Sequence, residues 1–242
     1  MINSIQFGSL FAAAMVAVTV QRPAPRPLPD KPLRQLDYNY SVDYQRSGGS
    51  DTGEISTRMG AARTSYNRGT GRQGKLHVDV MAVPMDGGIV LRVWEWPDTE
   101  SKPEQAFLCA VYRDTRVVCP ASMPVTDAET TLMTFLAHDF VDSNAIDGNN
   151  HWHQMYSNEY VDAKADFTVT AMADDGKLAT IVGHSVEKSA NGVHQDWIDD
   201  SKIVYDLTKE VPTLVHVSSK QASRGNSMYS VTMDFSLTKD SL

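Results

Sequence analysis

The chain has 242 residues, of which 41% are hydrophobic, and its 22 basic and 30 acidic residues give a formal net charge of −8 at pH 7. A charge of this sign repels nucleic-acid phosphates and excludes nucleic acid as the main partner. The chain after residue 35 is long enough for one sizeable core, so we expect a single β-rich domain over residues 36–242.

The N-terminus predicts export. Residues 1–20 form a signal-like apolar segment, which matches the core of a signal peptide and is short for a membrane span. Met1 to Gln6 contains no Lys or Arg, and Ala17-Val18-Thr19 is a poor cleavage site, so an uncleaved N-terminal membrane anchor and a buried helix are the alternatives. Residues 21–35 contain five prolines and predict an extended linker. We therefore expect a periplasmic or extracellular protein.

Basic residues are concentrated early in the chain. From Arg22 to Lys75 there are 10 basic and 5 acidic residues, whereas the rest of the chain has 12 basic and 25 acidic residues. The early cations, which include Arg58, Arg68 and Arg72, are expected to contact the acidic part of the same chain in preference to an external anionic surface.

Apolar and polar side chains alternate in the first part of the domain. Leu36 to Tyr44 alternates strictly and predicts a half-buried strand, and Leu76 to Ala82 has the same period. Ile89 to Trp96 is apolar on both faces and ends at a proline, and Ile55 to Asn67 predicts a weaker strand. The simplest arrangement of these strands is an antiparallel meander.

Both cysteines lie on one predicted β-hairpin, Phe107 to Pro120. If its turn is centred on Asp114, Cys109 faces Cys119, and such facing residues have Cα atoms about 4.5 Å apart, within the range of a disulfide. A bridge that closes a loop of about ten residues is worth roughly 2 to 3 kcal/mol in the chain-entropy model. We expect this disulfide in an oxidising compartment, with two reduced and buried thiols as the alternative.

A change of period predicts one long helix over residues 126–141. Thr126 and Glu129 form a capping box at its start, and the apolar side chains that follow have helical spacing. These apolar side chains are Leu132, Phe135, Leu136 and Phe140. These side chains form an apolar stripe along one side of the helix, which must be buried, so the helix is expected to pack on the sheet.

Strands resume after the helix and continue to the end of the chain. Asp175-Gly176 predicts a two-residue type I′ hairpin turn, and Asn191-Gly192 predicts a second turn. The first turn pairs Val169 with Val182 and Phe167 with His184, and the second pairs His184 with Asp199 and Val186 with Trp197. Further strands are expected over residues 201–207, 213–218 and 228–237.

The predicted fold is mainly β (α+β). It is an antiparallel meander of roughly ten strands, curved into a half-barrel or a barrel, with one long helix packed on the sheet. In outline this order of elements is similar to that of periplasmic carriers of lipoproteins, a likeness of fold that no motif accompanies. A sheet of this kind can curl around an apolar ligand.

Two groups of residues are candidates for binding. Arg92, Trp94 and Trp96 share one strand face and could stack on sugar rings or line an apolar pocket, although burial against the helix is favoured because large aromatics of a central strand are normally core. His151 and His153 would project from one strand face towards a shared metal ion, with solvated surface histidines as the alternative. Possible further metal ligands are His138, Asp139 and Asp142.

Ser185 is the candidate nucleophile. It lies in a stretch that looks like the nucleophile elbow of α/β-hydrolases with Glu187 in place of the final glycine, and Asp199 or Asp206 and then His216 follow it. A predicted strand continues past this stretch, which favours an ordinary strand residue. His184 beside Asp199 is expected to be a core histidine with its hydrogen bonds satisfied.

The sequence favours an exported, non-catalytic binding or envelope scaffold protein that holds a hydrophobic or lipidated ligand on a concave sheet. One alternative is a carbohydrate-contacting or adhesion module that uses Trp94 and Trp96. A hydrolase or metalloenzyme built on Ser185, or on His151 and His153, is the least favoured. No catalytic residue and no cofactor is predicted, and the expected partner is a hydrophobic ligand or an envelope protein.

Overall fold

The computed structural model describes residues 30–47, 71–83, 88–112, 115–120, 125–137, 140–141, 148–157, 161–189, 196–221 and 228–241. The signal-like segment, most of the linker and the strand predicted over residues 55–67 lie outside them. The described residues form one helix, α1 (Asp127–Phe135), and eleven strands. The strands are β1 (Arg34–Ser47), β2 (Arg72–Ala82), β3 (Ile89–Pro97), β4 (Phe107–Val111), β5 (Val117–Val118), β6 (His151–Ser157), β7 (Val161–Ala173), β8 (Leu178–Ser189), β9 (Trp197–Asp206), β10 (Val211–Gln221) and β11 (Met228–Asp240).

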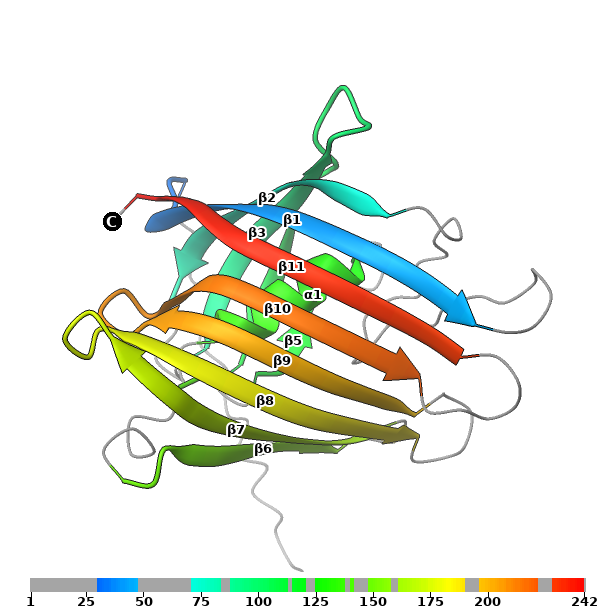
Figure 1. Ribbon diagram of the computed structural model, residues 1–242. Helices are drawn as coiled ribbons and strands as arrows, with labels where there is room; N and C mark the ends of the chain where they lie inside the picture. The colour runs from blue at the N-terminus through cyan, green and yellow to red at the C-terminus, as the bar shows by residue number, and fades with distance from the viewer. Residues whose placement is uncertain are drawn as a thin grey trace, which may run out of the picture.

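All eleven strands belong to one antiparallel sheet with the order β5-β4-β3-β2-β1-β11-β10-β9-β8-β7-β6. The sheet consists of two meanders, β1 to β5 and β6 to β11, which are joined in the middle by pairing of the first and last strands (Figure 1). The predicted mainly β meander is therefore confirmed. The sheet does not close, and β5 and β6 are its two edges.

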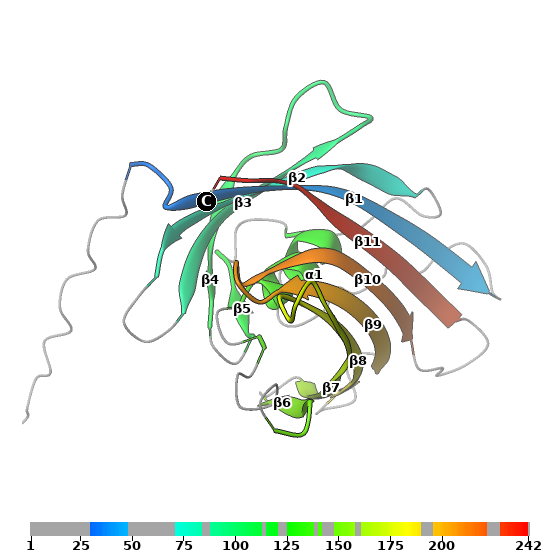
Figure 2. The same cartoon turned by 60° about the vertical axis from the view of Figure 1, so that its left-hand side comes forward.

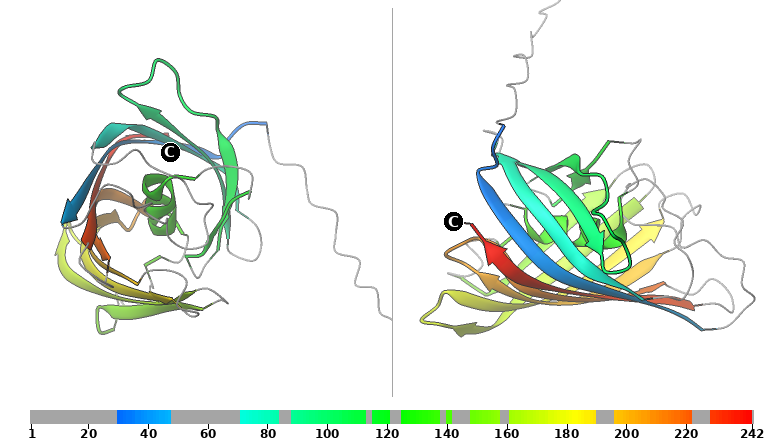
Figure 3. Two further views of the ribbon diagram at one scale, coloured as in Figure 1. Left: turned by 90° about the vertical axis from the view of Figure 1, so that its right-hand side faces the viewer. Right: turned by 90° about the horizontal axis from the view of Figure 1, so that it is seen from above.

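Strong curvature turns the sheet into a half-barrel, and α1 lies in its concavity (Figure 2). Seen along the curved sheet, the strands surround the helix on several sides (Figure 3). Eight of the nine residues of α1 are buried. Within the described stretches, no helix combines the length and the apolar character needed to cross a membrane.

The concave face is the core because inward and outward side chains alternate along each strand. On β1 the inward residues Leu36, Tyr38, Tyr40 and Val42 are buried, whereas Asn39 and Ser41 between them are exposed. The apolar stripe of the predicted helix is buried as expected. The helix itself is shorter than predicted: α1 ends at Phe135, and a turn follows at Leu136.

The predicted disulfide joins Cys109 and Cys119, with a Cα–Cα distance of 4.4 Å. Val111 pairs with Val117 next to it, which confirms the predicted register of this hairpin. The bridge links β4 to the residue that follows β5, at one edge of the sheet.

The hairpin of β7 and β8 follows the predicted register only near its turn. Asp175 and Gly176 have positive φ angles of 50° and 85°, as a type I′ turn requires, and Ala173 pairs with Leu178. An irregularity between Val169 and Ala171 then shifts the register by one residue. The predicted pairs are therefore wrong beyond this point: Val169 pairs with Ile181, and Phe167 pairs with Gly183.

The pairing of β8 with β9 also differs from the prediction by one residue. His184 pairs with Asp200 instead of Asp199, and Val186 pairs with Ile198 instead of Trp197. The predicted turn at Asn191-Gly192 lies outside the described residues.

Candidate functional site

A pocket lies where the half-barrel fails to close. The side chain of Thr115, just before β5, donates a hydrogen bond to Oε1 of Gln154 on β6 at 3.2 Å, so the two sheet edges touch at this point. Both residues line a pocket of about 80 Å³ between α1 and the wall formed by β7, β8 and β9. We call it the seam pocket. It is the best-formed candidate ligand site because it is concave and lies beside the opening of the sheet.

The seam pocket has both apolar and hydroxyl-bearing walls. Phe135, Phe167 and Val217 provide apolar surface, and Ala163 and Ala165 keep the β7 wall shallow. The hydroxyl groups come from Thr130, Thr131 and Thr134 on α1 and from Ser185 and Ser201 on the sheet. Such a lining suits a ligand that is largely apolar and carries a few polar atoms.

The sheet side of the seam pocket also carries two carboxylates, Glu187 and Asp199. The hydroxyl of Ser185 donates to Oδ2 of Asp199 at 2.8 Å. Ser185 and Asp199 are paired across β8 and β9, so both side chains face the concavity.

Aromatic rings fill the interior next to the pocket. Phe140 packs edge-on against Phe135 and Phe167, with ring centroids 5.1 Å apart in both pairs. Its centroid lies 6.1 Å from that of Trp152 on β6 and 5.7 Å from that of Tyr205 on β9. These contacts connect the segment after α1 to the β6–β9 half of the sheet.

A cluster of buried polar side chains connects α1 to the other half of the sheet. Thr126, the N-cap of α1, donates its hydroxyl to Glu95 of β3 at 2.6 Å. The same hydroxyl accepts the backbone N–H of Glu129, and the Glu129 carboxylate accepts the backbone N–H of Thr126 at 2.8 Å. This is the predicted capping box, extended by a carboxylate from the sheet.

The charges of this cluster are only partly compensated. Glu95 is fully buried and forms a 2.5 Å ion pair with Arg72, which also contacts Glu104. Burial raises the pKa of Glu95 to about 7, although Arg72 opposes the shift. Burial and the charge of Glu95 raise the pKa of Glu129 well above its ordinary value. For Arg72, the predicted contact of an early cation with acidic residues of its own chain is therefore found.

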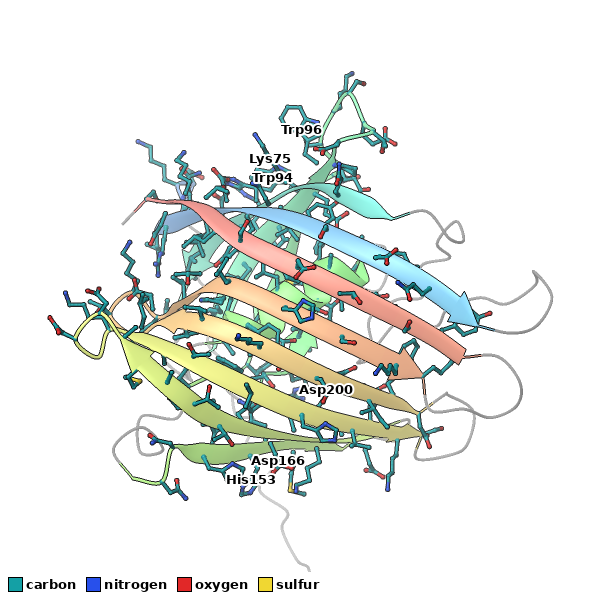
Figure 4. The ribbon with its side chains drawn as sticks, in the orientation of Figure 1. Lys75, Trp94, Trp96, His153, Asp166 and Asp200 are labelled. Atoms are coloured by element: carbon teal, nitrogen blue, oxygen red, sulfur yellow. A yellow bond between two sulfur atoms is a disulfide. The ribbon has the colours of Figure 1, made fainter. Side chains whose placement is uncertain are left out.

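The candidate binding residues Arg92, Trp94 and Trp96 lie together on the outer face of the sheet. Figure 4 shows Trp94 and Trp96 beside Lys75, on the side away from α1. Trp96 is 47% exposed, so the favoured expectation of burial against the helix is wrong for this residue. The residues are held there by neighbouring strands, since Lys75 pairs with Trp96 and His77 with Trp94.

His151 and His153 are exposed on the outer face of β6, on one strand face as predicted. The ring of His151 is hydrogen-bonded to Thr168 at 3.1 Å and lies 4.0 Å from Asp166. Among the described residues, no group of three or more His, Cys, Asp or Glu side chains could hold a metal ion. The proposed further ligands His138, Asp139 and Asp142 lie outside the described residues.

The residues of the hydrolase hypothesis are not brought together. Ser185 faces the concavity, whereas His216 is half exposed on the outer face and bonds to Asp234 at 2.7 Å. His184 is also exposed on the outer face and bonds to Asp200 at 2.9 Å. The hydrolase alternative, the least favoured from the sequence, therefore has no assembled site here. The prediction of a core His184 is wrong, because alternation along β8 turns Ala179 and Ile181 inward and His184 outward.

Sequence reasoning missed the seam pocket and the role of Glu95. The capping box identified Glu129, but nothing in the sequence marks Glu95 as buried, since charged residues in strands usually face solvent. The alternation along β3 was the available signal: Glu95 has the same parity as Leu91 and Val93, which are both buried.

No family model and no curated protein matches the sequence. Among solved structures, a chain described by the words "lipid-protein interactions in lipovitellin" is similar in part, with a TM-score of 0.47 and 10% sequence identity. The similarity covers 87% of this chain and 26% of that chain, so this chain spans about a quarter of its length. A similarity of this size carries no functional information.

Proposed function

We propose that the protein is an exported, non-catalytic binding protein that holds the apolar part of a ligand in the seam pocket. The observation that carries this proposal is the position of the pocket, which lies where the two edges of the half-barrel meet. A ligand can enter there without breaking the main sheet ladder, because the Thr115–Gln154 contact is a side-chain hydrogen bond and not a strand pair.

The chemistry of the lining favours an acyl chain or a lipidated peptide. Phe135, Phe167 and Val217 provide apolar contact, and the hydroxyls of α1 can receive the polar end of such a ligand. The pocket of about 80 Å³ is smaller than the roughly 150 Å³ cavity that accommodates benzene in an engineered protein. A full acyl chain therefore requires α1 to move away from the β7–β9 wall.

Export is supported by the disulfide and by the apolar N-terminal segment. A bridge between Cys109 and Cys119 persists in oxidising compartments and is rare where thiols are kept reduced. Catalysis is disfavoured because Ser185, which faces the pocket, bonds to a carboxylate and has its candidate base His216 on the opposite face.

The test is ligand binding by the purified protein. Native mass spectrometry before and after organic extraction should reveal a co-purified lipid, and a fluorescent fatty acid should bind the extracted protein.

Ala165→Phe fills the pocket and should weaken binding about tenfold or more, with the smaller Ala163→Leu as a second filler if the first variant misfolds. Ala171→Phe, at an exposed position of the same strand, is the matched control and should bind normally. Absence of both lipid and probe binding, or normal binding by both fillers, contradicts the proposal.

A further inference from the structure

The geometry points to a second binding site on the outer face of β2 and β3, where we propose that a neutral carbohydrate chain stacks on Trp96 and Trp94. This outer aromatic site consists of Lys75, His77, Arg92, Trp94 and Trp96. It lies on the opposite side of the sheet from the seam pocket and does not depend on the function proposed for that pocket.

Trp96 is exposed and yet held in one orientation. Its ring is 47% exposed, and its indole N–H donates to the backbone carbonyl of Glu100 at 3.1 Å. A large aromatic ring fixed in water loses little conformational entropy when a ligand stacks on it. Exposed, preorganised aromatic rings of this kind are typical anchors of binding sites.

The second ring, Trp94, is supported by its neighbours. The ring of His77 packs on it with centroids 4.1 Å apart, and the guanidinium of Arg92 lies 6.0 Å from its centroid. Trp94 and Trp96 are two residues apart on one strand, so their side chains project from the same face, with Cα atoms about 6.8 Å apart. This spacing allows neighbouring sugar rings of one chain to contact both.

A buried carboxylate fixes the polar groups around the rings. Asp79 is fully buried although it lies on the outer face, and it accepts hydrogen bonds from Gln35 at 3.0 Å and from Nε of Arg92 at 2.9 Å. It also lies 3.0 Å from a ring nitrogen of His77, whose other ring nitrogen contacts Asp37. Burial of a charge is costly, so this arrangement holds the His77 and Arg92 side chains in fixed positions.

The charge balance of the site selects the class of ligand. The charge of Arg92 is matched by Asp79, and His77 lies between Asp79 and Asp37. With Lys75 included, two cationic side chains face two carboxylates, so the site carries little net charge. A membrane of anionic lipids or a polyanion would require an excess of unpaired cations. Aromatic rings beside paired polar groups instead suit an uncharged ring with one apolar face and several hydroxyls, which describes a pyranose.

The experiment measures binding of neutral glycans to the full chain. Isothermal titration with cellohexaose, chitohexaose and mannohexaose, together with pull-down on cellulose and chitin, should identify at least one binder. Trp96→Ala should weaken that binding about tenfold or more, the effect of truncating an aromatic anchor, whereas Trp96→Phe should retain part of it. Leu108→Ala removes an exposed apolar side chain without a ring from the same face of β4, and it should bind within about twofold of the wild type.

Two further measurements separate this site from the alternatives. Trp96 is exposed, so its replacement should leave the circular dichroism spectrum and the unfolding midpoint unchanged, and the Ala165→Phe variant should bind glycan normally. Failure of every glycan to bind, equal binding by Trp96→Ala and wild type, or binding that depends on Trp96 only to phosphatidylglycerol vesicles would each overturn the carbohydrate assignment.

Discussion

Glu95 and Glu129 are buried carboxyls whose protonation depends on the fold. Both interact with Thr126, and both have pKa values raised mainly by burial. A carboxyl with a raised pKa binds its proton more tightly in the folded chain than in the unfolded chain. By linkage, the free energy of unfolding then falls as pH rises from the unfolded pKa through the folded one.

This linkage predicts lower stability in mild alkali. For Glu95 the window runs from about pH 4.5 to about 7, and the contribution to the free energy of unfolding is on the order of 3 kcal/mol. Urea unfolding should therefore give a smaller free energy at pH 8 than at pH 5. Glu129→Gln imitates the protonated side chain and should reduce this difference, whereas the exposed control Glu100→Gln should not. An equal difference in all three proteins would show that the buried pair does not titrate in this range.

Two glycines are required by close packing in the folded sheet, and the sequence around them does not reveal this requirement. Gly183 belongs to the stretch that resembles a nucleophile elbow, but its role is spatial: a Cβ there would lie 2.6 Å from the ring of Phe167 and 2.4 Å from Oγ of Ser201. Gly74 similarly allows close approach of β3, since a Cβ would lie 2.3 Å from the carbonyl oxygen of Trp96. Neither requirement can be derived from the residues next to the glycine in the sequence.

At the scale of elements, the N-cap of α1 adds a polar link to the sheet beside the burial of the helix itself. The hydroxyl of Thr126 caps the helix and also binds Glu95 of β3, so one side chain links the helix to the sheet. Because α1 lies beside the seam pocket, the strength of this link also affects how readily the helix can move for a ligand.

Removal of the Thr126 hydroxyl should destabilise the protein. Thr126→Ala loses the N-cap, worth about 1 kcal/mol, and leaves a buried carboxylate oxygen of Glu95 without a donor, which costs about 1 to 3 kcal/mol more. Thr126→Ser keeps the hydroxyl and is the matched control, with an expected loss below about 1 kcal/mol. Urea unfolding at pH 7 measures the difference, and equal stability of the two variants would rule out the hydroxyl as the link.

Elements with strong local signals could be predicted from the sequence, and their long-range register could not. The alternation from Leu36 to Tyr44, the capping box of Thr126 and the cysteine hairpin each depend on residues close together in the chain. The bulge after Val169 has no such signal, yet it changes the β8 partners of Val169 and Phe167 by one residue. The hydrolase candidates Ser185 and His216 lie apart because they project from opposite faces of the sheet, whereas the face shared by Trp94 and Trp96 follows from one strand alone.

At the scale of the whole molecule, the edges of the sheet need protection, because unpaired strand edges promote aggregation. β5 has only two residues, and the disulfide fixes its end to β4. The bridge therefore stabilises the edge that faces the opening of the half-barrel.

Loss of the disulfide should lower stability moderately. The bridge closes a loop with a sequence separation of 10 residues, for which chain entropy gives about 2 to 3 kcal/mol. The Cys109→Ala/Cys119→Ala double variant should show this decrease in urea unfolding, and reductant should lower the wild type by a similar amount without affecting the variant. If reductant changed neither protein, and alkylation found free thiols in the untreated wild type, the bridge would be absent in solution.

Pairing of the first strand with the last also determines the order in which the protein can fold. Each meander forms from neighbours in the chain, but Leu36 must find Asp240 before the two halves become one sheet. Closing so long a loop is slow, because the conformational entropy of the loop is lost before the strand contacts form and offset that loss. While the polypeptide is being synthesised, one side of β1 therefore stays unpaired until residues 228–240 are available, and during this interval the exposed edge can pair with another chain.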